Sequence, residues 1–176
     1  MVEREDVVAA VVAAAGGKLT SRVRLQKTVY LLDRLGLRSD FQYDYHHYGP
    51  YSRDLDNAAE DAKAFDLVEE TYAHRISDGA RYSIFAVKPD LEPKREAYGE
   101  LGIDKAFEVA GLLAKTNVTV LELAATIDWL WHEEDVADWR SEVTKRKGAK
   151  VQHGRLERAV ELLGELRLPP PSLRTH

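Results

Sequence analysis

The hydrophobic period changes twice along this 176-residue chain, and this limits the fold more than any other feature of the sequence. In residues 4–66 apolar side chains recur every three or four positions, as they do on helices. In residues 67–88 they alternate, as on strands, on either side of the turn-forming Ser77-Asp78-Gly79. From residue 103 the helical period returns. The sequence therefore predicts a mainly α protein with one small β-hairpin.

Apolar stripes and terminal residues place the individual elements. We expect helices over residues 4–15, 20–35, 50–66, 103–115, 119–133, 135–147 and 155–167, and strands over residues 67–73 and 81–88. Thr20 or Ser21 is expected to cap the second helix, and Thr119 with Glu122 has the spacing of a capping box. Three helices followed by a hairpin is the order of a winged helix. We therefore predict a winged-helix-like N-terminal unit with a helical C-terminal extension.

The domain organisation follows from the prolines and glycines. Residues 89–102 carry two prolines and two glycines among charged residues, which is the composition of a linker. Three consecutive prolines that begin at Pro169 end the last helix. We expect a winged-helix-like unit over residues 1–88, a linker over 89–102, a helical extension over 103–168 and a frayed tail over 169–176.

Composition excludes several classes of protein. The chain has no cysteine, so disulfides, thiolate nucleophiles and cysteine-based zinc sites are excluded. Its net charge of −5 provides no overall field that would attract nucleic acid or an anionic membrane. The apolar run Val7–Ala15 is too short to span a bilayer, and acidic residues precede it where a secretory signal would carry positive charge. We expect a cytoplasmic protein with no membrane partner.

Sequence motifs for catalysis are missing from the chain. It contains neither of the glycine-rich phosphate-binding patterns, G-x-G-x-x-G and G-x-x-x-x-G-K-[ST], and it lacks the nucleophile pattern G-x-S-x-G. Carboxylates are plentiful, but the sequence cannot place two of them across a cleft. We therefore expect that the protein is not an enzyme, with no catalytic residues and no cofactor.

The stretch YDYHHYGPYSRDL, residues 43–55, could be a metal site or the start of a helix. Proline fits the first turn of a helix, so Pro50 after Gly49 is interpreted as a helix start. His46 and His47 are adjacent and point to opposite sides of an extended chain, so they cannot share one ion. Asp44 and His46 together fall short of a zinc ligand set. The stretch is therefore predicted to be a scaffold element, and no metal is expected.

Three segments in order, RLQKTVYLLDRLG, YHHYGPYSRDL and FDLVEE, resemble the Panacea antitoxin domain and its SocA-like and YwgA-like relatives. The resemblance covers about residues 5–88. The matching scaffold residues are Leu25, Lys27, Tyr30, Tyr48, Gly49 and Pro50. Asp66 departs from the pattern, because relatives usually have glycine at that position. The resemblance implies a protein-binding module, as in antitoxins and a proteolytic adaptor, with no enzymatic residues to carry over.

Basic residues form two clusters that could bind a partner. The candidate binding patch contains Arg22, Arg24, Lys145, Arg146, Lys147, Lys150 and Arg155. These side chains could be a solvated helix end and loop, or a docking surface for an acidic partner or a nucleic-acid backbone. The helix predicted over residues 50–66 carries two basic residues against five acidic ones, so it would be repelled by DNA phosphates.

These observations favour a non-enzymatic protein-binding module of the antitoxin-like or adaptor-like kind. Its expected partner is a protein, either a toxin or the client of an adaptor. The alternative is a nucleic-acid-associated regulator that uses the basic patch near the C-terminus. The sequence does not predict the oligomeric state.

Overall fold

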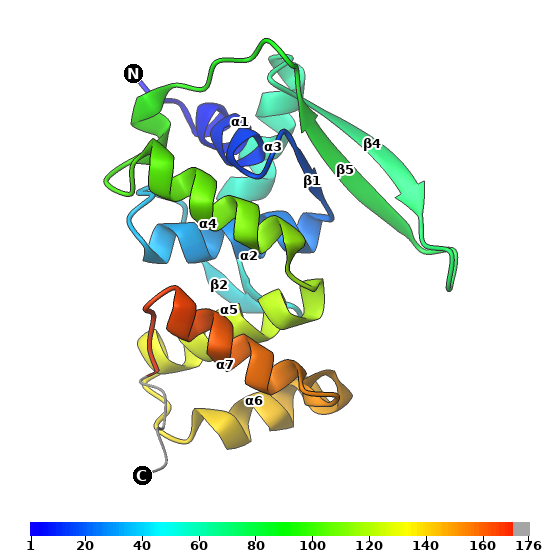
Figure 1. Ribbon diagram of the computed structural model, residues 1–176, viewed down its shortest axis with the longest axis vertical. Helices are drawn as coiled ribbons and strands as arrows, with labels where there is room; N and C mark the ends of the chain where they lie inside the picture. Colours follow the sequence, from blue (N-terminus) through cyan, green and yellow to red (C-terminus); the bar gives the residue numbers. More distant parts are fainter. Residues whose placement is uncertain (171–176) are drawn as a thin grey trace.

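The computed structural model describes residues 1–170, and this part of the chain is mainly helical with small antiparallel sheets (Figure 1). The helices are α1 (Arg4–Ala14), α2 (Arg22–Arg34), α3 (Arg53–Ala64), α4 (Ile103–Lys115), α5 (Val118–His132), α6 (Trp139–Lys147) and α7 (Arg155–Glu165). The strands are β1 (Lys18–Thr20), β2 (Asp44–His46), β3 (Gly49–Tyr51), β4 (Val68–His74) and β5 (Arg81–Val87). Two short 3-10 helices are η1 (Arg95–Tyr98) and η2 (Gly148–Val151). The prediction of a mainly α chain with a small β-hairpin is confirmed.

Side-chain caps decide where the helices begin. Ser21 caps α2, because its hydroxyl accepts a hydrogen bond from the Arg24 backbone N–H at 3.1 Å. The predicted capping box of Thr119 and Glu122 is wrong. Asn117 caps α5 instead, and its side-chain oxygen accepts hydrogen bonds from the Thr119 and Val120 backbone N–H groups. Glu122 is buried one turn further along and forms ion pairs there.

The main sheet has the strand order β1-β5-β4, with both pairs antiparallel. β4 and β5 form the predicted hairpin, with a register that runs from Val68 opposite Val87 to His74 opposite Arg81. This hairpin projects from the body of the molecule (Figure 1). β1 adds a third strand that the sequence does not predict, and its Leu19 lies opposite Phe85. Three residues are too few to show a period.

A second, smaller hairpin corrects the interpretation of Gly49 and Pro50 as a helix start. Pro50 lies in β3, opposite Tyr45 of β2, and α3 begins only at Arg53. The Ser52 hydroxyl caps α3 by accepting a hydrogen bond from the Leu55 backbone N–H at 3.2 Å. Proline is compatible with a short edge strand because the fixed φ suits an extended chain.

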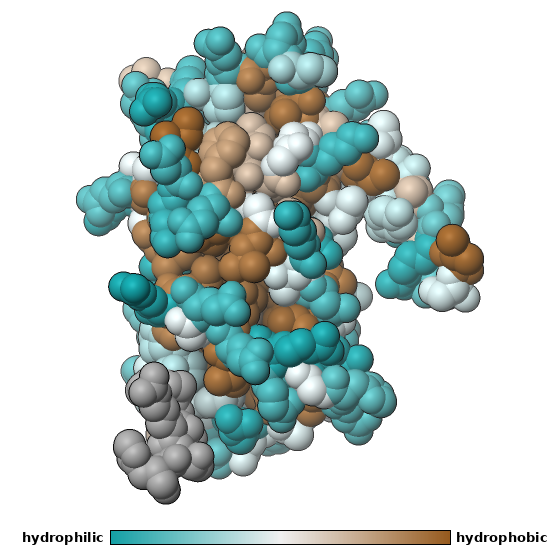
Figure 2. All heavy atoms as spheres, in the orientation of Figure 1, coloured by the Kyte–Doolittle hydropathy of each residue, from teal (hydrophilic) through white to brown (hydrophobic). Residues whose placement is uncertain are grey.

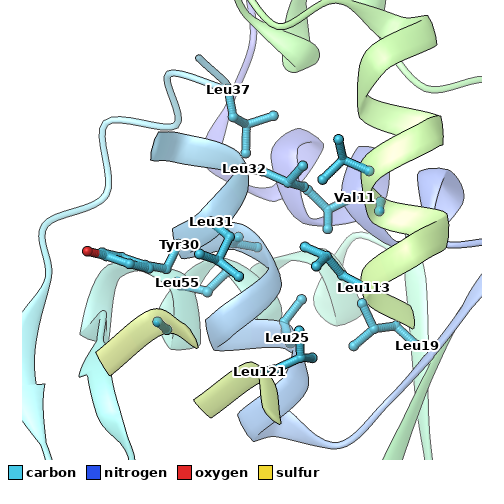
Figure 3. Close-up of a cluster of buried hydrophobic side chains, with 14 of the residues drawn as sticks. Val11, Leu19, Leu25, Tyr30, Leu31, Leu32, Leu37, Leu55, Leu113 and Leu121 are labelled. Atoms are coloured by element: carbon cyan, nitrogen blue, oxygen red, sulfur yellow. The ribbon is translucent and has the colours of Figure 1, made fainter. Parts of the chain in front are cut away.

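One hydrophobic core joins the two halves of the chain. Side chains from α1, α2 and α3 pack with Leu113 of α4 and Leu121 of α5 (Figure 3). The segment 89–102, which its composition predicts to be a linker, contributes η1 to this core. Tyr98 is fully buried, and its hydroxyl donates a hydrogen bond to the Ala10 carbonyl oxygen at 3.0 Å. Proline and glycine mark chain reversals here, and the segment is anchored by an aromatic ring that fills space beside α1.

The last two helices, α6 and α7, are shorter than the periodicity predicts. α6 begins at Trp139 and not at residue 135, and the Asp138 carboxylate accepts a hydrogen bond from the Ser141 backbone N–H. α7 ends at Glu165. Of the predicted frayed tail, residues 171–176 lie outside the described part of the chain. Within residues 1–170, no helix has the length and apolar character needed to cross a membrane.

Candidate functional site

The scaffold motif brings two segments of the sequence into direct contact. The Lys27 ammonium of α2 donates a hydrogen bond to the Pro50 carbonyl oxygen of β3 at 2.6 Å, and Lys27 is only 1% exposed. Gly49 has a φ of +94°, and a Cβ at this position would lie 2.7 Å from the Thr126 hydroxyl oxygen of α5. Close approach of β3 to α5 therefore requires glycine.

Two further motif residues face the interior. The Tyr30 hydroxyl donates a hydrogen bond to the buried Asp128 carboxylate at 2.7 Å, and the Arg34 guanidinium donates to the same oxygen at 2.8 Å. Leu25 lies in the core. Tyr48 differs from the rest of the motif, because it is 49% exposed at the turn between β2 and β3. Five of the six motif residues are therefore buried, and Tyr48 alone among them is exposed.

Burial changes the acid–base behaviour of Lys27. Desolvation lowers the pKa of this lysine to about 7. Attraction from Glu122 compensates in part, whereas repulsion from Lys147 and Lys150 lowers the pKa further. Between pH 7 and pH 10 the folded state therefore holds Lys27 mostly neutral, whereas the unfolded state holds it protonated. Because the unfolded state binds more protons, the free energy of unfolding rises with pH in this window.

We expect this rise to be about 1 kcal/mol per pH unit between pH 7 and pH 9. Lys27→Met is expected to flatten most of it, because the group that titrates is removed. Lys147, whose pKa is also lowered by burial, acts in the same direction and leaves a residual slope. Urea denaturation of both proteins at several pH values measures the slopes. Equal slopes would contradict the assignment to Lys27.

The second half of the chain contributes a buried carboxylate that holds the basic segment in place. Glu122 of α5 forms ion pairs with Lys147 at 3.4 Å and with Lys150 at 3.0 Å. Lys147 also donates a hydrogen bond to the His47 carbonyl oxygen at 3.1 Å. Lys150 places its ammonium 4.9 Å from the centre of the Tyr48 ring. α5, η2 and the β2–β3 turn are thereby joined through one acidic side chain.

Other members of the candidate basic patch also make internal contacts. Arg146 binds Glu134 and Glu142, each at 2.8 Å. Arg155 donates hydrogen bonds to the backbone carbonyl oxygens of Lys150 and Ala149. Lys145 is exposed, and within the described residues it has no hydrogen bond or ion pair. Most of the basic side chains in residues 145–155 therefore make contacts within the protein.

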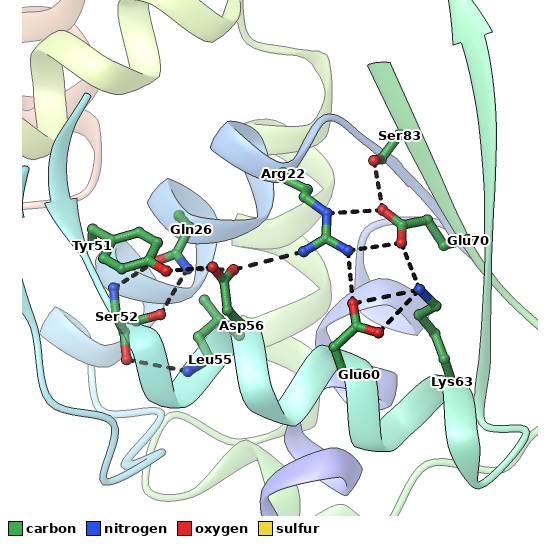
Figure 4. Close-up of polar contacts among 10 residues, drawn as sticks. All are labelled: Arg22, Gln26, Tyr51, Ser52, Leu55, Asp56, Glu60, Lys63, Glu70 and Ser83. Carbon is green, nitrogen blue, oxygen red and sulfur yellow. Dashed lines mark hydrogen bonds and ion pairs between the residues drawn. The ribbon is translucent and has the colours of Figure 1, made fainter. Parts of the chain in front are cut away.

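Arg22, at the start of α2, also makes internal contacts (Figure 4). Arg22 binds the Glu70 carboxylate with two nitrogens, at 2.9 and 2.8 Å, and binds Glu60 at 2.8 Å. Lys63 and Ser83 bind Glu70 as well. Although burial alone would raise it, these hydrogen bonds hold the pKa of Glu70 at about 2.

Arg24, also near the start of α2, binds the end of α4. Its guanidinium donates hydrogen bonds to the backbone carbonyl oxygens of Leu113 and Thr116, at the end of α4. These carbonyls are among those that a helix leaves without an internal partner. The candidate patch therefore divides into two separate clusters, and six of its seven residues contact their own chain.

The projecting hairpin carries the most exposed apolar side chains near this region. Ile76 at the tip is fully exposed, and Tyr72 of β4 is 49% exposed. The Arg81 guanidinium of β5 lies 4.2 Å from the centre of the Tyr72 ring. Figure 2 shows apolar surface at the end of the hairpin, separated by a notch from the body of the molecule.

A groove of about 820 Å³ lies between this hairpin and the body, and we call it the hairpin groove. One wall is formed by Arg75, Arg81 and Tyr82 of the hairpin. The floor and the other wall come from the starts of α2 and α5, the β2–β3 turn and η2. Their lining residues are Thr20, Ser21, Val23, Arg24, His47, Tyr48, Val118, Thr119, Glu122 and Lys150. The groove thus lies where both basic clusters and Tyr48 meet.

The hairpin groove is lined mainly by basic, polar and aromatic side chains. Its buried carboxylate, Glu122, is held by two lysines. Among residues 1–170 no three His, Asp or Glu side chains lie close enough together to hold a metal ion. Arginine, lysine and tyrosine side chains are suited to polar and aromatic contacts with a partner. The side chains that line the hairpin groove therefore favour binding of a partner molecule.

Sequence reasoning missed the acidic residues that organise this region. Glu122 and Asp128 interrupt an otherwise apolar stretch of α5, and both are buried. A charged residue on a buried helix face needs a partner, so this pattern was a usable signal. Glu70 gave no such signal, because it lies beside Glu69 in a strand with several polar residues.

No known protein family and no curated protein sequence matches this chain.

Proposed function

We propose that this protein is a non-enzymatic protein-binding module, antitoxin-like or adaptor-like, whose N-terminal part is a winged-helix-like unit. The winged-helix assignment is supported by the strand order β1-β5-β4 and by the element order α1-β1-α2-β2-β3-α3-β4-β5, in which the β2–β3 hairpin is an insertion between α2 and α3. In this arrangement the β4–β5 hairpin is the wing. The wing and the hairpin groove beside it form the binding surface.

The observation that carries the proposal is the hairpin itself. It projects from the body with Ile76 and Tyr72 exposed, and it borders a groove lined by two further tyrosines, Tyr48 and Tyr82. Exposed apolar side chains that cluster beside a groove are typical of protein interaction sites. Tyrosine and arginine are enriched in such interfaces.

The charge of α3 favours a protein partner over DNA. In a winged helix this element would enter the major groove. α3 has acidic residues in its first turn, Asp54 and Asp56, and further acidic side chains at Glu60 and Asp61. Phosphate contacts dominate DNA affinity, so a helix of this charge would be repelled. The partner is therefore proposed to be a toxin or an adaptor client, and it would bind the wing side.

Affinity capture from a lysate of the organism that encodes the protein tests the proposal. We expect the wild-type protein to retain a protein in near-stoichiometric amount. A Tyr72→Ala, Ile76→Asp variant is expected to reduce the recovery about tenfold, because exposed aromatic and apolar residues dominate interface energies. Phe65→Ala is the matched control, since Phe65 is exposed but lies outside the wing and groove.

Two results would contradict the proposed function. One is equal recovery of the captured protein with wild type and with the wing variant, while circular dichroism shows that both are folded. The other is recovery of nucleic acid with no stoichiometric protein.

A further inference from the structure

We infer that the hairpin groove receives an acidic, extended segment of the partner protein. This inference rests on the proposed function and adds to it the chemistry of the partner. It concerns the groove wall and floor, whereas the proposed function rests on the exposed side chains of the wing.

The charge of the lining points to an anionic occupant. Four cationic side chains, those of Arg24, Arg75, Arg81 and Lys150, line the groove against the single carboxylate of Glu122. That carboxylate is neutralised within the fold, since it pairs with Lys150 and with the buried Lys147. The lining therefore has an excess of positive charge, although the whole chain has a net charge of −5. Such a local field favours negatively charged partners.

Arg75 and Arg81, the two cationic residues of the hairpin wall, are the groove side chains most available to a partner. Arg81 has no ion pair within residues 1–170 and instead stacks on Tyr72. Arg75 pairs only with Asp78 in the exposed turn, at 2.7 Å, and an exposed pair of this kind is worth little. A carboxylate in the groove can therefore bind either arginine without breaking a contact that holds the fold.

The apolar side chains of the groove favour a polypeptide over a nucleic acid. Val23, Val118 and the rings of Tyr48 and Tyr82 provide apolar surface between the cations, which suits a chain of alternating acidic and apolar residues. The next pocket along α2 is lined by Arg22 and Lys27 as well as by Asp56, so its charge does not separate the two kinds of partner. The preference for a polypeptide therefore rests on the apolar side chains of the groove, which a polyphosphate backbone would leave without partners.

Fluorescence anisotropy with defined probes tests the inference. The probe is a fluorescein-labelled peptide of about eight alternating Glu and Val residues, which spans roughly 26 Å when extended. The comparison probes are the same peptide with Gln in place of Glu and a labelled oligothymidine. We expect the Glu peptide to bind, the Gln peptide to bind at least about tenfold more weakly, and affinity for the Glu peptide to fall with added salt.

Charge reversal in the groove locates the binding. Arg81→Glu is expected to weaken binding of the Glu peptide about tenfold. Lys105→Glu makes the same change in net charge at an exposed position of α4, outside the groove, and is expected to weaken binding less than about twofold. Circular dichroism checks that both variants are folded.

The remaining outcomes would overturn the inference. Tighter binding of oligothymidine than of the Glu peptide would assign the groove to nucleic acid. If no probe binds, or if Arg81→Glu and Lys105→Glu weaken binding equally, the groove is not a binding site for acidic peptides. In those cases a partner captured through Tyr72 and Ile76 would still support the proposed function. Peptide binding without any captured protein would contradict the proposed function and not the charge preference of the groove.

Discussion

Gly49→Val is expected to lower the free energy of unfolding by about 3–5 kcal/mol, one of the two largest effects of any single substitution considered for this protein. Two causes add. Gly49 has a φ of +94°, which a β-branched residue adopts only with strain. Its new Cβ would also lie 2.7 Å from the hydroxyl oxygen of Thr126, which is fully buried and cannot move into open space.

Two further variants separate these causes. Gly79→Val has a positive φ of +71° but no atom within 4 Å of the new Cβ, so it is expected to cost only about 1–2 kcal/mol. Adding Thr126→Ala to Gly49→Val removes the clashing hydroxyl and is expected to recover part of the loss. Urea denaturation measures all four proteins. Unchanged stability in Gly49→Val, with partner binding alone lost, would show that the motif is a binding site and not a scaffold.

Glu122→Gln is expected to lower the free energy of unfolding by about 3–5 kcal/mol, because it removes one partner of a buried ion pair. The side chains of Lys147 and Glu122 are 3% and 4% exposed, so the lysine would keep a buried charge without a counter-ion. The nearby Lys27 would lose the attraction of the same carboxylate. Chemical denaturation provides the measurement, and Glu108→Gln on the exposed face of α4 is the matched control.

A compensating change distinguishes this cause from a loss of packing. Lys147→Met removes the stranded charge, so the double variant with Glu122→Gln is expected to be more stable than Glu122→Gln alone. If the double variant is less stable than either single variant, the ion pair is not the source of the loss.

The long helices and the β4–β5 hairpin were predictable from length and pattern. α3 and α4 bury one face each, whereas α1, α2 and α5 are buried over runs of consecutive residues. β1, β2 and β3 were not predictable, since strands of three residues show no period. Gly49 and Pro50 suggested a helix start, but their place is decided by Lys27 and Thr126, which lie far away in the sequence.

The candidate site was predictable only in part for the same reason. The basic residues are visible in the sequence, but their pairing is not. Arg22 and Glu70, or Lys150 and Glu122, meet only after the chain has folded. The sequence therefore left open whether the two basic clusters were solvated or formed a docking surface, and it did not predict that most of their side chains pair within the fold. What remains open is the hairpin groove, and Arg81 is its most available cation.

The charges of Glu122, Lys147 and Lys150 act on Lys27 in the folded protein, and this has a consequence for biosynthesis. A ribosome completes residues 1–88 before it adds Glu122, Lys147 and Lys150, so the emerging chain holds Lys27 for a time without these neighbours. The carbonyl groups of Leu113 and Thr116, which accept hydrogen bonds from Arg24, are also synthesised after residue 88. We therefore expect the first half of the chain to reach its final packing only after residues up to Lys150 have left the exit tunnel.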